Sequence, residues 1–225
     1  MNYYYYIAGM QEVSRSEGKT ERSCREIAEE LKEELSANDY EMIELIAGKR
    51  NAPKFIQWID RQGINREEIS EEELFGHWYR YGMLQKNRFL RDWFTFNLDL
   101  NNVLTAFICR KNGWDIAKHL VGESQVTNCM REHLNDKDFG LTAEWEYYPV
   151  VAQIAAEEDI MEKEKKTDAL KWDWIDEMNT FNTFSVEVVI GHYLKCEMIE
   201  RWNMLNIEDG EKAFRAILSK LTLKK

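Results

Sequence analysis

Apolar residues recur at helical spacing along most of the chain. Ile27, Leu31 and Leu35 are four residues apart, and they follow "SCRE" (23–26), a Ser-x-x-Glu sequence typical of a capping box at a helix start. A helix is therefore predicted over about 24–36. The same periodicity predicts further helices over 40–48, capped by Asn38 or Asp39; over 52–63, ending at Gly63; over 70–113 as one or two long helices; over about 124–135; over 142–179, started or kinked by Pro149; and over 185–204. "GEKAFRAILSKL" (210–221) closes the chain.

Helix breakers are rare in this pattern. The chain has 2 prolines and 11 glycines among many Glu, Lys, Leu and Ala residues, so we expect an all-α protein made of helical bundle units with long helices. The first twenty residues are less clear, because four consecutive tyrosines fit either a strand or a helix start. The helical pattern becomes regular from Ser70 onward. We therefore expect a reduced N-terminal helical unit at 1–69 and a larger helical region at 70–225.

Charge and composition narrow the possible partners. The 225 residues carry a formal net charge of -11 with dispersed Lys and Arg, which argues against nucleic acid and favours a basic or neutral protein partner. The chain lacks the run of about 18 to 20 apolar residues that crosses a bilayer, and "MNYYYYIAGM" lacks the features of a signal peptide. The four cysteines form no CxxC pair, as expected of buried reduced thiols. We expect a cytoplasmic protein without direct membrane insertion.

Sequence motifs for catalysis and cofactor binding are missing. The chain has no Glu-x-x-His pair of the kind that holds di-metal sites in helical bundles, and His192 with Cys196 is an isolated i,i+4 pair. It also lacks the P-loop, the GxGxxG motif and the GxSxG motif. We therefore expect no metal site, no cofactor and no enzymatic activity.

A short polar motif occurs twice. Asp99-x-x-Asn102 and Glu200-x-x-Asn203 each place an acid and an amide one helical turn apart, after aromatic residues, and the interval is 101 residues for both members. Asp99 lies at the edge of an apolar stripe, and its neighbouring face carries Arg88, Asp92 and Arg110. This arrangement is typical of a charge network between packed helices. Two such short matches also arise by chance, so the spacing alone leaves a chance recurrence open beside the pseudo-repeat that we expect in the region 70–225.

Two acids extend the apolar stripe of the last predicted long helix. Glu197 and Glu200 fall on the same side as Val186, Ile190, Tyr193 and Met204. Burying an unpaired carboxylate costs several kcal/mol, so we expect both acids to meet basic or amide partners and to brace adjoining helices. Alternatively, the stripe faces another subunit, or it lines the acidic pocket of a free-standing helical protein that binds a cationic small molecule.

The two copies of the motif resemble a known family. The repeated segment of the C subunit of V/A-type ATPases, called d in the eukaryotic V-ATPase, is similar to two stretches of this chain: "LDLNNVLTAFICRKNG", with Asp99, Asn102, Arg110 and Gly113, and "FSVEVVIGHYLKCEMIERWN", with Ser185, Tyr193, Leu194, Glu200 and Asn203. Over about 70–220 the chain resembles the shorter C-like proteins of bacterial V-type ATPase operons, a family of unknown function.

This resemblance implies a non-catalytic, all-helical rotor part. Such a subunit sits on the membrane proteolipid ring, receives the foot of the central stalk and passes torque between them, so it is cytoplasmic and peripheral to the membrane. The chain departs from the family pattern in three respects. Two helical copies replace the usual three, Ile108 stands where an Arg commonly follows the first Asn, and Asp209 stands at the matching position after Asn203.

Overall fold

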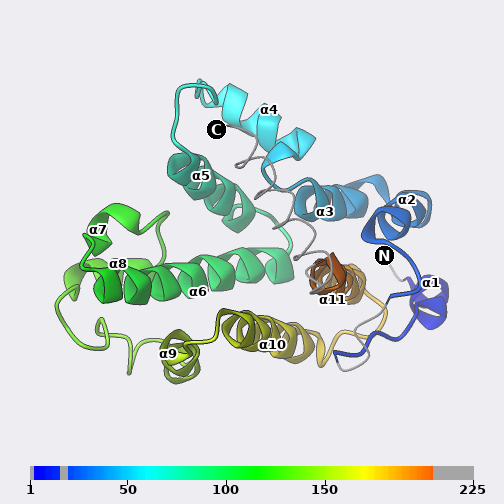
Figure 1. Ribbon diagram of the computed structural model, residues 1–225. Coiled ribbons are helices and arrows are strands. Elements are labelled where there is room, and N and C mark those ends of the chain that lie inside the picture. Colours follow the sequence, from blue (N-terminus) through cyan, green and yellow to red (C-terminus); the bar gives the residue numbers. More distant parts are fainter. Residues whose placement is uncertain (1–2, 16–19, 205–225) are drawn as a thin grey trace, which may run out of the picture. The chain divides into compact units, whose positions relative to one another are not determined.

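The described part of the chain is entirely helical in its regular elements. The structure is a computed structural model that describes residues 3–15 and 20–204. Within these ranges it contains eleven α-helices and a short 3-10 helix, so the predicted all-α fold is confirmed (Figure 1). The predicted last segment, 210–221, lies outside the described residues.

The helices belong to two compact units. Unit 1 comprises residues 1–40 and 175–225, and unit 2 comprises residues 41–174. The boundary that we expected between residues 69 and 70 falls inside unit 2. The helices of unit 1 are α1 (Tyr4–Gly9), α2 (Cys24–Glu34) and α11 (Val186–Met204). Those of unit 2 are the 3-10 helix η1 (Lys49–Asn51), α4 (Pro53–Arg61), α5 (Glu71–Met83), α6 (Arg88–Asn112), α7 (Ile116–His119), α8 (Gln125–Glu132) and α9 (Tyr148–Ala156). Two helices, α3 (Ala37–Gly48) and α10 (Ile160–Asn179), contribute residues to both units.

Helix boundaries follow local capping. Ser23 and Glu26 form the predicted capping box of α2, with each side chain bonded to the other residue's backbone N–H. The predicted cap of α3 is wrong, because the hydroxyl of Ser36 accepts from the backbone N–H of Asp39 and the helix already begins at Ala37. Of the four tyrosines near the N-terminus, Tyr3 is the N-cap of α1, and the other three form its first turn, so these residues start a helix and form no strand.

The two longest predicted stretches are each divided. Residues 84–87 separate α5 from α6, whose N-cap Asn87 accepts from the backbone N–H of Leu90 at 3.0 Å. The stretch 142–179 contains α9, with Pro149 in its first turn, and α10. The side chain of Asp159 accepts from the backbone N–H groups of Met161 and Glu162 at 2.8 and 3.0 Å, which starts a new helix there.

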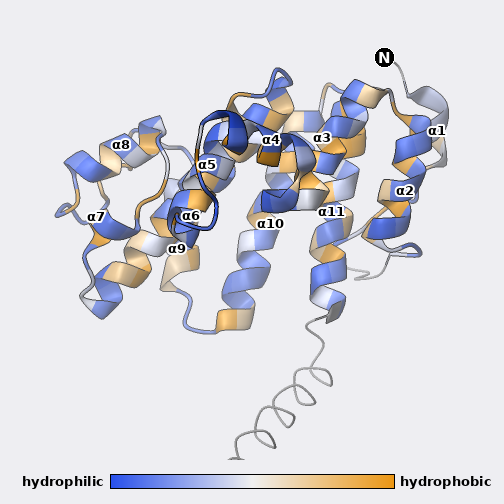
Figure 2. Ribbon diagram, turned by 90° about the horizontal axis from the view of Figure 1, so that it is seen from above, coloured by the Kyte–Doolittle hydropathy of each residue, from blue (hydrophilic) through white to orange (hydrophobic). Residues whose placement is uncertain are grey.

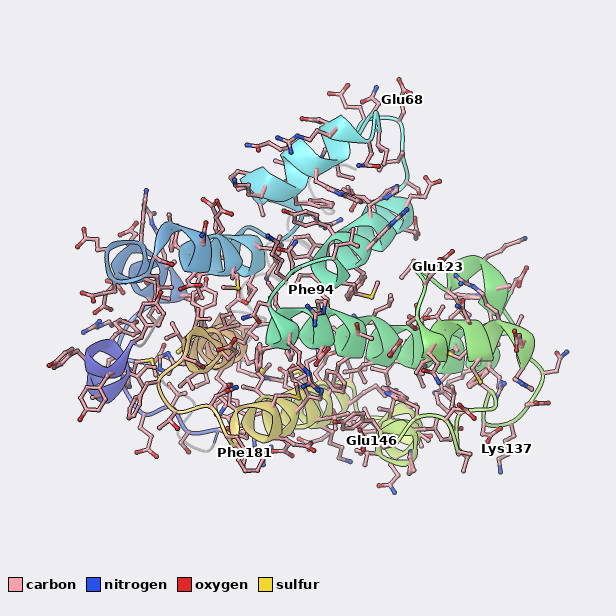
Figure 3. All side chains as sticks on the ribbon, turned by 180° about the vertical axis from the view of Figure 1, so that it is seen from behind. Glu68, Phe94, Glu123, Lys137, Glu146 and Phe181 are labelled. Atoms are coloured by element: carbon pink, nitrogen blue, oxygen red, sulfur yellow. The ribbon has the colours of Figure 1, made fainter. Side chains whose placement is uncertain are left out.

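The core of unit 2 is centred on α6. The apolar stripe beside Asp99 consists of Phe89, Phe96, Leu100, Val103 and Phe107, and this 25-residue helix buries all of them except Phe107, which is half-buried. Phe94 meets Trp78 of α5 edge to face, with ring centroids 5.0 Å apart. Gly82 of α5 packs directly on Phe94, since a Cβ at this position would lie 2.0 Å from a ring carbon. Phe94 is labelled in Figure 3. Figure 2 shows the mixture of hydrophobic and hydrophilic positions along these helices that is typical of amphipathic packing.

Candidate functional site

Asn102 is a predicted site residue whose buried side chain makes three hydrogen bonds. Its side chain is 1% exposed, and its amide nitrogen donates to the backbone oxygen of Val121 and to the hydroxyl of Thr127, both at 2.8 Å. Its amide oxygen accepts from the backbone N–H of Val121 at 3.1 Å. One side chain of α6 thus joins the backbone of the loop before α8 to the first turn of α8.

Asp99 lies one turn earlier on α6 and contacts the same segment. The Ser124 hydroxyl donates to the Asp99 carboxylate at 2.5 Å, and Ser124 also accepts from the backbone N–H of Thr127 as the N-cap of α8. The hydroxyl oxygens of Ser124 and Thr127 are 2.9 Å apart. We call Asp99, Asn102, Ser124 and Thr127 the α6 brace, and residues 120–127 the braced segment.

The α6 brace has an unusual electrostatic environment. Asp99 is 4% exposed, and no ion pair within the described ranges includes it. Burial raises the pKa of Asp99 to about 7, while the hydrogen bond from Ser124 lowers it in part. Of the predicted charge network, the pair between Arg88 and Asp92 forms at 3.3 Å, but Asp99 takes no part in it and Arg110 bonds to backbone oxygens elsewhere.

Arg110 holds the loop that follows α8. Its guanidinium donates to the backbone oxygens of Lys137 and Asp136, both at 2.7 Å, and of Leu134 at 3.2 Å. It also stacks over the Phe139 ring, 3.8 Å from the centroid. A planar group with several fixed donors suits such a set of carbonyl acceptors. Arg110 therefore ties the C-terminal half of α6 to the loop around residues 134–139.

Glu197 and Glu200 are half-buried and do not share the deep burial of Asp99. Glu200 accepts from the backbone N–H of Cys24 at 3.3 Å, so its partner is the N-terminus of α2. Burial and a hydrogen bond to Glu200 raise the pKa of the Cys24 thiol. A carboxylate at this position offsets the positive end of the α2 dipole.

Asn203 differs from its predicted counterpart Asn102. It is exposed near the C-terminal end of α11, whereas Asn102 is buried. The two acid-x-x-Asn copies thus have different environments, and the structure joins only the first to a buried polar cluster among the described residues. The sequence pattern did not predict Ser124 and Thr127 as partners of Asp99 and Asn102. Their Ser-x-x-Thr spacing at the start of a predicted helix was the available signal.

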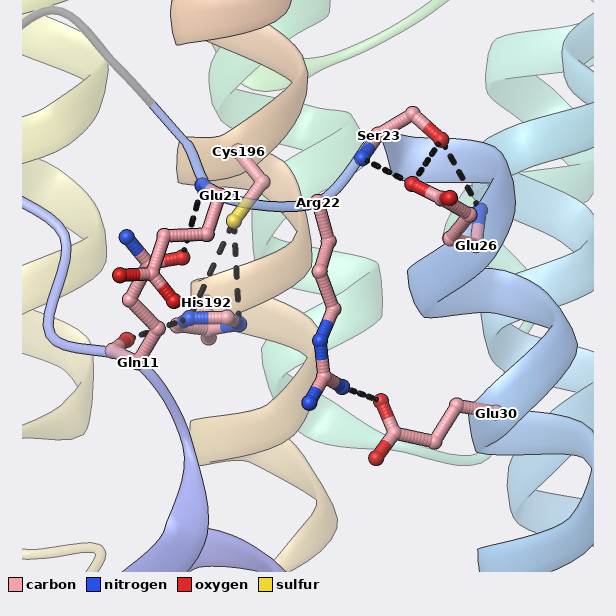
Figure 4. A network of polar contacts seen from close by, with 8 residues as sticks. All are labelled: Gln11, Glu21, Arg22, Ser23, Glu26, Glu30, His192 and Cys196. Carbon is pink, nitrogen blue, oxygen red and sulfur yellow. Dashed lines mark hydrogen bonds and ion pairs between the residues drawn. The ribbon is translucent and has the colours of Figure 1, made fainter.

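Unit 1 contains a cavity of about 410 Å³ between α1, α2 and α11. Its lining comprises Tyr5, Tyr6, Gly9, Met10, Gln11, Glu21, Arg22, Ile27, Glu30, Glu34 and His192, and thus neither Glu197 nor Glu200. Figure 4 shows the ion pair between Arg22 and Glu30 at its wall. Burial and the nearby Glu30 raise the pKa of Tyr6 to about 12.

His192 and Cys196 form a contact beside this cavity (Figure 4). The Nε2 atom of His192 lies 2.9 Å from the backbone oxygen of Gln11, so Nε2 carries the proton, and Nδ1 lies 3.8 Å from the Cys196 sulfur. Burial lowers the pKa of His192 and raises that of Cys196 to about 11. The thiol is thus protonated at neutral pH, which is unsuitable for a nucleophile.

Within residues 3–15 and 20–204, no cluster of three His, Cys, Asp or Glu side chains could hold a metal ion. None of the helices in these ranges is long and apolar enough to cross a membrane.

These features define an all-α protein whose buried polar side chains mainly connect its own helices and loops. Residues 53–224 match the family described as "Protein of unknown function (DUF2764)", and the chain belongs to this family. The match includes the α6 brace, Arg110 and α11. No curated protein and no solved structure matches the chain.

Proposed function

We propose that the protein is a non-catalytic subunit of the central rotor of a V/A-type ATPase. In this role it links the membrane proteolipid ring to the central stalk and transmits torque during ATP-coupled ion transport. Its location would be cytoplasmic, at the membrane surface through the complex. The resemblance of 70–220 to the C subunit and to short C-like proteins of V-type ATPase operons supports this proposal.

The observation that carries the proposal is the α6 brace. In the first copy of the motif, Asp99 and Asn102 cross-connect a long helix to the braced segment, and neither lines the cavity of about 410 Å³ in unit 1 or the cavity of about 580 Å³ in unit 2. Arg110 ties the same helix to a second loop. Torque transmission needs stiffness, and buried polar contacts with complete hydrogen bonding resist relative movement of the elements that they join. The formal net charge of -11 favours a basic partner surface.

Affinity purification tests this proposal. The tagged full chain is recovered from gently solubilised membranes, and the co-purifying proteins are identified and quantified by mass spectrometry. We expect stalk and ring subunits of a V-type ATPase in stoichiometric amounts, and their loss from a strain without the ATPase genes. Recovery of the protein alone, from cells that contain the assembled ATPase, would contradict the proposal.

A second candidate function is a free-standing binding protein for a cationic small molecule. The cavity of unit 1 favours it, because Tyr5 and Tyr6 lie in its lining together with Glu21, Glu30 and Glu34. Aromatic faces and carboxylates both attract cations. Calorimetric titration of the full chain with spermidine distinguishes this candidate. Saturable binding that Glu34→Gln weakens would support it, while heats equal to those of dilution would exclude spermidine as the ligand.

A further inference from the structure

Asp99 is a buried carboxyl group of unit 2, and no ion pair of the described residues includes it. Its described partner is a neutral hydroxyl, and the next members of the cluster, Thr127 and Asn102, are neutral as well. A carboxylate in such surroundings lacks the cation that normally compensates burial, whereas a protonated carboxyl needs none. The surroundings of Asp99 therefore favour the protonated form of its carboxyl group.

Charged groups on the neighbouring elements do not replace that missing cation. Titratable side chains on the elements around α6 are Glu71, Glu72, Glu73, His77, Tyr79, Arg80 and Tyr81 on α5; Lys118 and His119 on α7; Glu123 in the braced segment; Cys129, Arg131 and Glu132 on α8; Tyr148 on α9; and buried Asp168 beside a run of exposed charges on α10. The pKa of Asp99 is shifted by two causes, burial and the hydrogen bond from Ser124, and none of these charged groups is among them.

The braced segment is also part of a surface. Gly122, with a φ of 66°, turns the chain toward α5, where a Cβ on Gly76 would lie 3.6 Å from the Gly122 backbone nitrogen. Together with α5 it borders a cavity of about 580 Å³ that Glu73, Gly76, His77, Arg80, Met83, Leu84, Gly122 and Glu123 line. Glu123 is labelled on this segment in Figure 3. A change in how the segment is held would therefore change this cavity.

We propose that Asp99 is a proton-binding site that controls how firmly the braced segment is held on α6 and, through it, the shape of the cavity beside α5. This proton site belongs to unit 2 itself and does not depend on an ATPase partner. The protonated carboxyl fits the buried cluster. The carboxylate favours opening of the segment, because opening brings water to it.

The direction of the pH dependence follows from the two pKa values of Asp99. The pKa is about 7 in the closed segment, against about 3.9 for an Asp in water. The closed state therefore retains a proton that the open state releases, and the stabilisation is complete below about pH 4 and lost as pH rises through about 7. Opening should become about 50-fold more frequent between about pH 5 and pH 7 and should change little above about pH 8.

Amide hydrogen exchange of the full-length chain tests this proposal. The probe is the backbone N–H of Val121, which donates to Asn102, measured from about pH 5 to pH 8.5 and divided by the intrinsic exchange rate at each pH. Protection should fall as pH rises in the wild type and remain constant in Asp99→Asn. His77→Gln is the matched control for the nearby histidine of α5 and should retain the wild-type dependence.

A carbon-13 titration of the Asp99 carboxyl in the wild type provides a second measurement that does not require a variant to fold. We expect its midpoint near neutral pH. Three results would overturn the proposal: a carboxyl midpoint below about pH 5, protection of Val121 that is independent of pH in the wild type, or loss of the dependence in His77→Gln.

Discussion

Replacing Asn102 by Ala removes three hydrogen bonds at once. Its amide nitrogen donates to Val121 and Thr127, and its amide oxygen accepts from Val121, in a site where Asn102 is 1% exposed. At about 1 kcal/mol for each bond, the loss is about 3 kcal/mol. The better helix propensity of Ala returns about 0.5 kcal/mol. We therefore expect Asn102→Ala to lower the free energy of unfolding by about 2.5 kcal/mol.

Urea unfolding followed by tryptophan fluorescence measures this loss in unit 2. Every tryptophan of the chain except Trp202 belongs to residues 41–174, so the signal reports mainly on that unit. The midpoint should shift to lower urea with an unchanged slope, because the surface exposed on unfolding is nearly the same. Exchange of the Val121 amide should accelerate as well, since its acceptor is removed.

Asn112→Ala is the matched control for this substitution. Asn112 lies on the same helix, but it is exposed and bonds to the backbone oxygen of Ile108 at 2.8 Å. We expect a change within about 0.5 kcal/mol, as for most surface substitutions. Equal effects of Asn102→Ala and Asn112→Ala on the unfolding free energy would refute the assignment of Asn102 to a bracing role.

Three further substitutions, the first with a matched control, test other contacts. Gly82→Ala should destabilise unit 2 by about 2 kcal/mol in the same urea assay, because its Cβ would overlap the Phe94 ring, whereas Gly76→Ala has room and should be neutral or stabilising. Lysine cannot reproduce the planar set of donors of Arg110, so Arg110→Lys should accelerate amide exchange in the loop after α8 by about tenfold. Unchanged exchange would contradict the role of Arg110 in holding this loop on α6. Glu200→Gln should lower the free energy of unfolding of unit 1, measured by thermal unfolding, by about 0.5 kcal/mol, because it removes the charge at the start of α2. A loss above about 3 kcal/mol would contradict this small helix-end effect and would instead indicate the buried bracing pair that the sequence predicts.

Local patterns explain most of the helices correctly. The capping box of Ser23 and Glu26, the Gly113 that ends α6 with a φ of 70°, and the Pro149 in the first turn of α9 act within a few residues. Such signals can be recognised without knowledge of what packs nearby. The division of 142–179 was missed because Asp159 sits in a charge run that also suits a continuous exposed helix.

Only one half of the candidate site could be predicted, because local patterns do not indicate which distant residues meet. The spacing of Asp99 and Asn102 places them on successive turns of one helix, which follows from helix geometry alone. Their partners Ser124 and Thr127 lie 25 residues further along the chain in each case. No periodicity connects residues at such a separation, so this pairing depends on how α6 and α8 meet in the fold.

The amino-acid sequence by itself determined that the described chain is helical and where most of its helices begin and end, because backbone hydrogen bonding and capping act over one or two turns. The tertiary structure decided which polar residues are buried. Asp99-x-x-Asn102 and Glu200-x-x-Asn203 are nearly equivalent locally, yet Asn102 is enclosed by the braced segment while Asn203 is exposed. The physical reason is that burial, and with it the pKa of Asp99 and the strength of each hydrogen bond, depends on the distant residues that exclude water from the site.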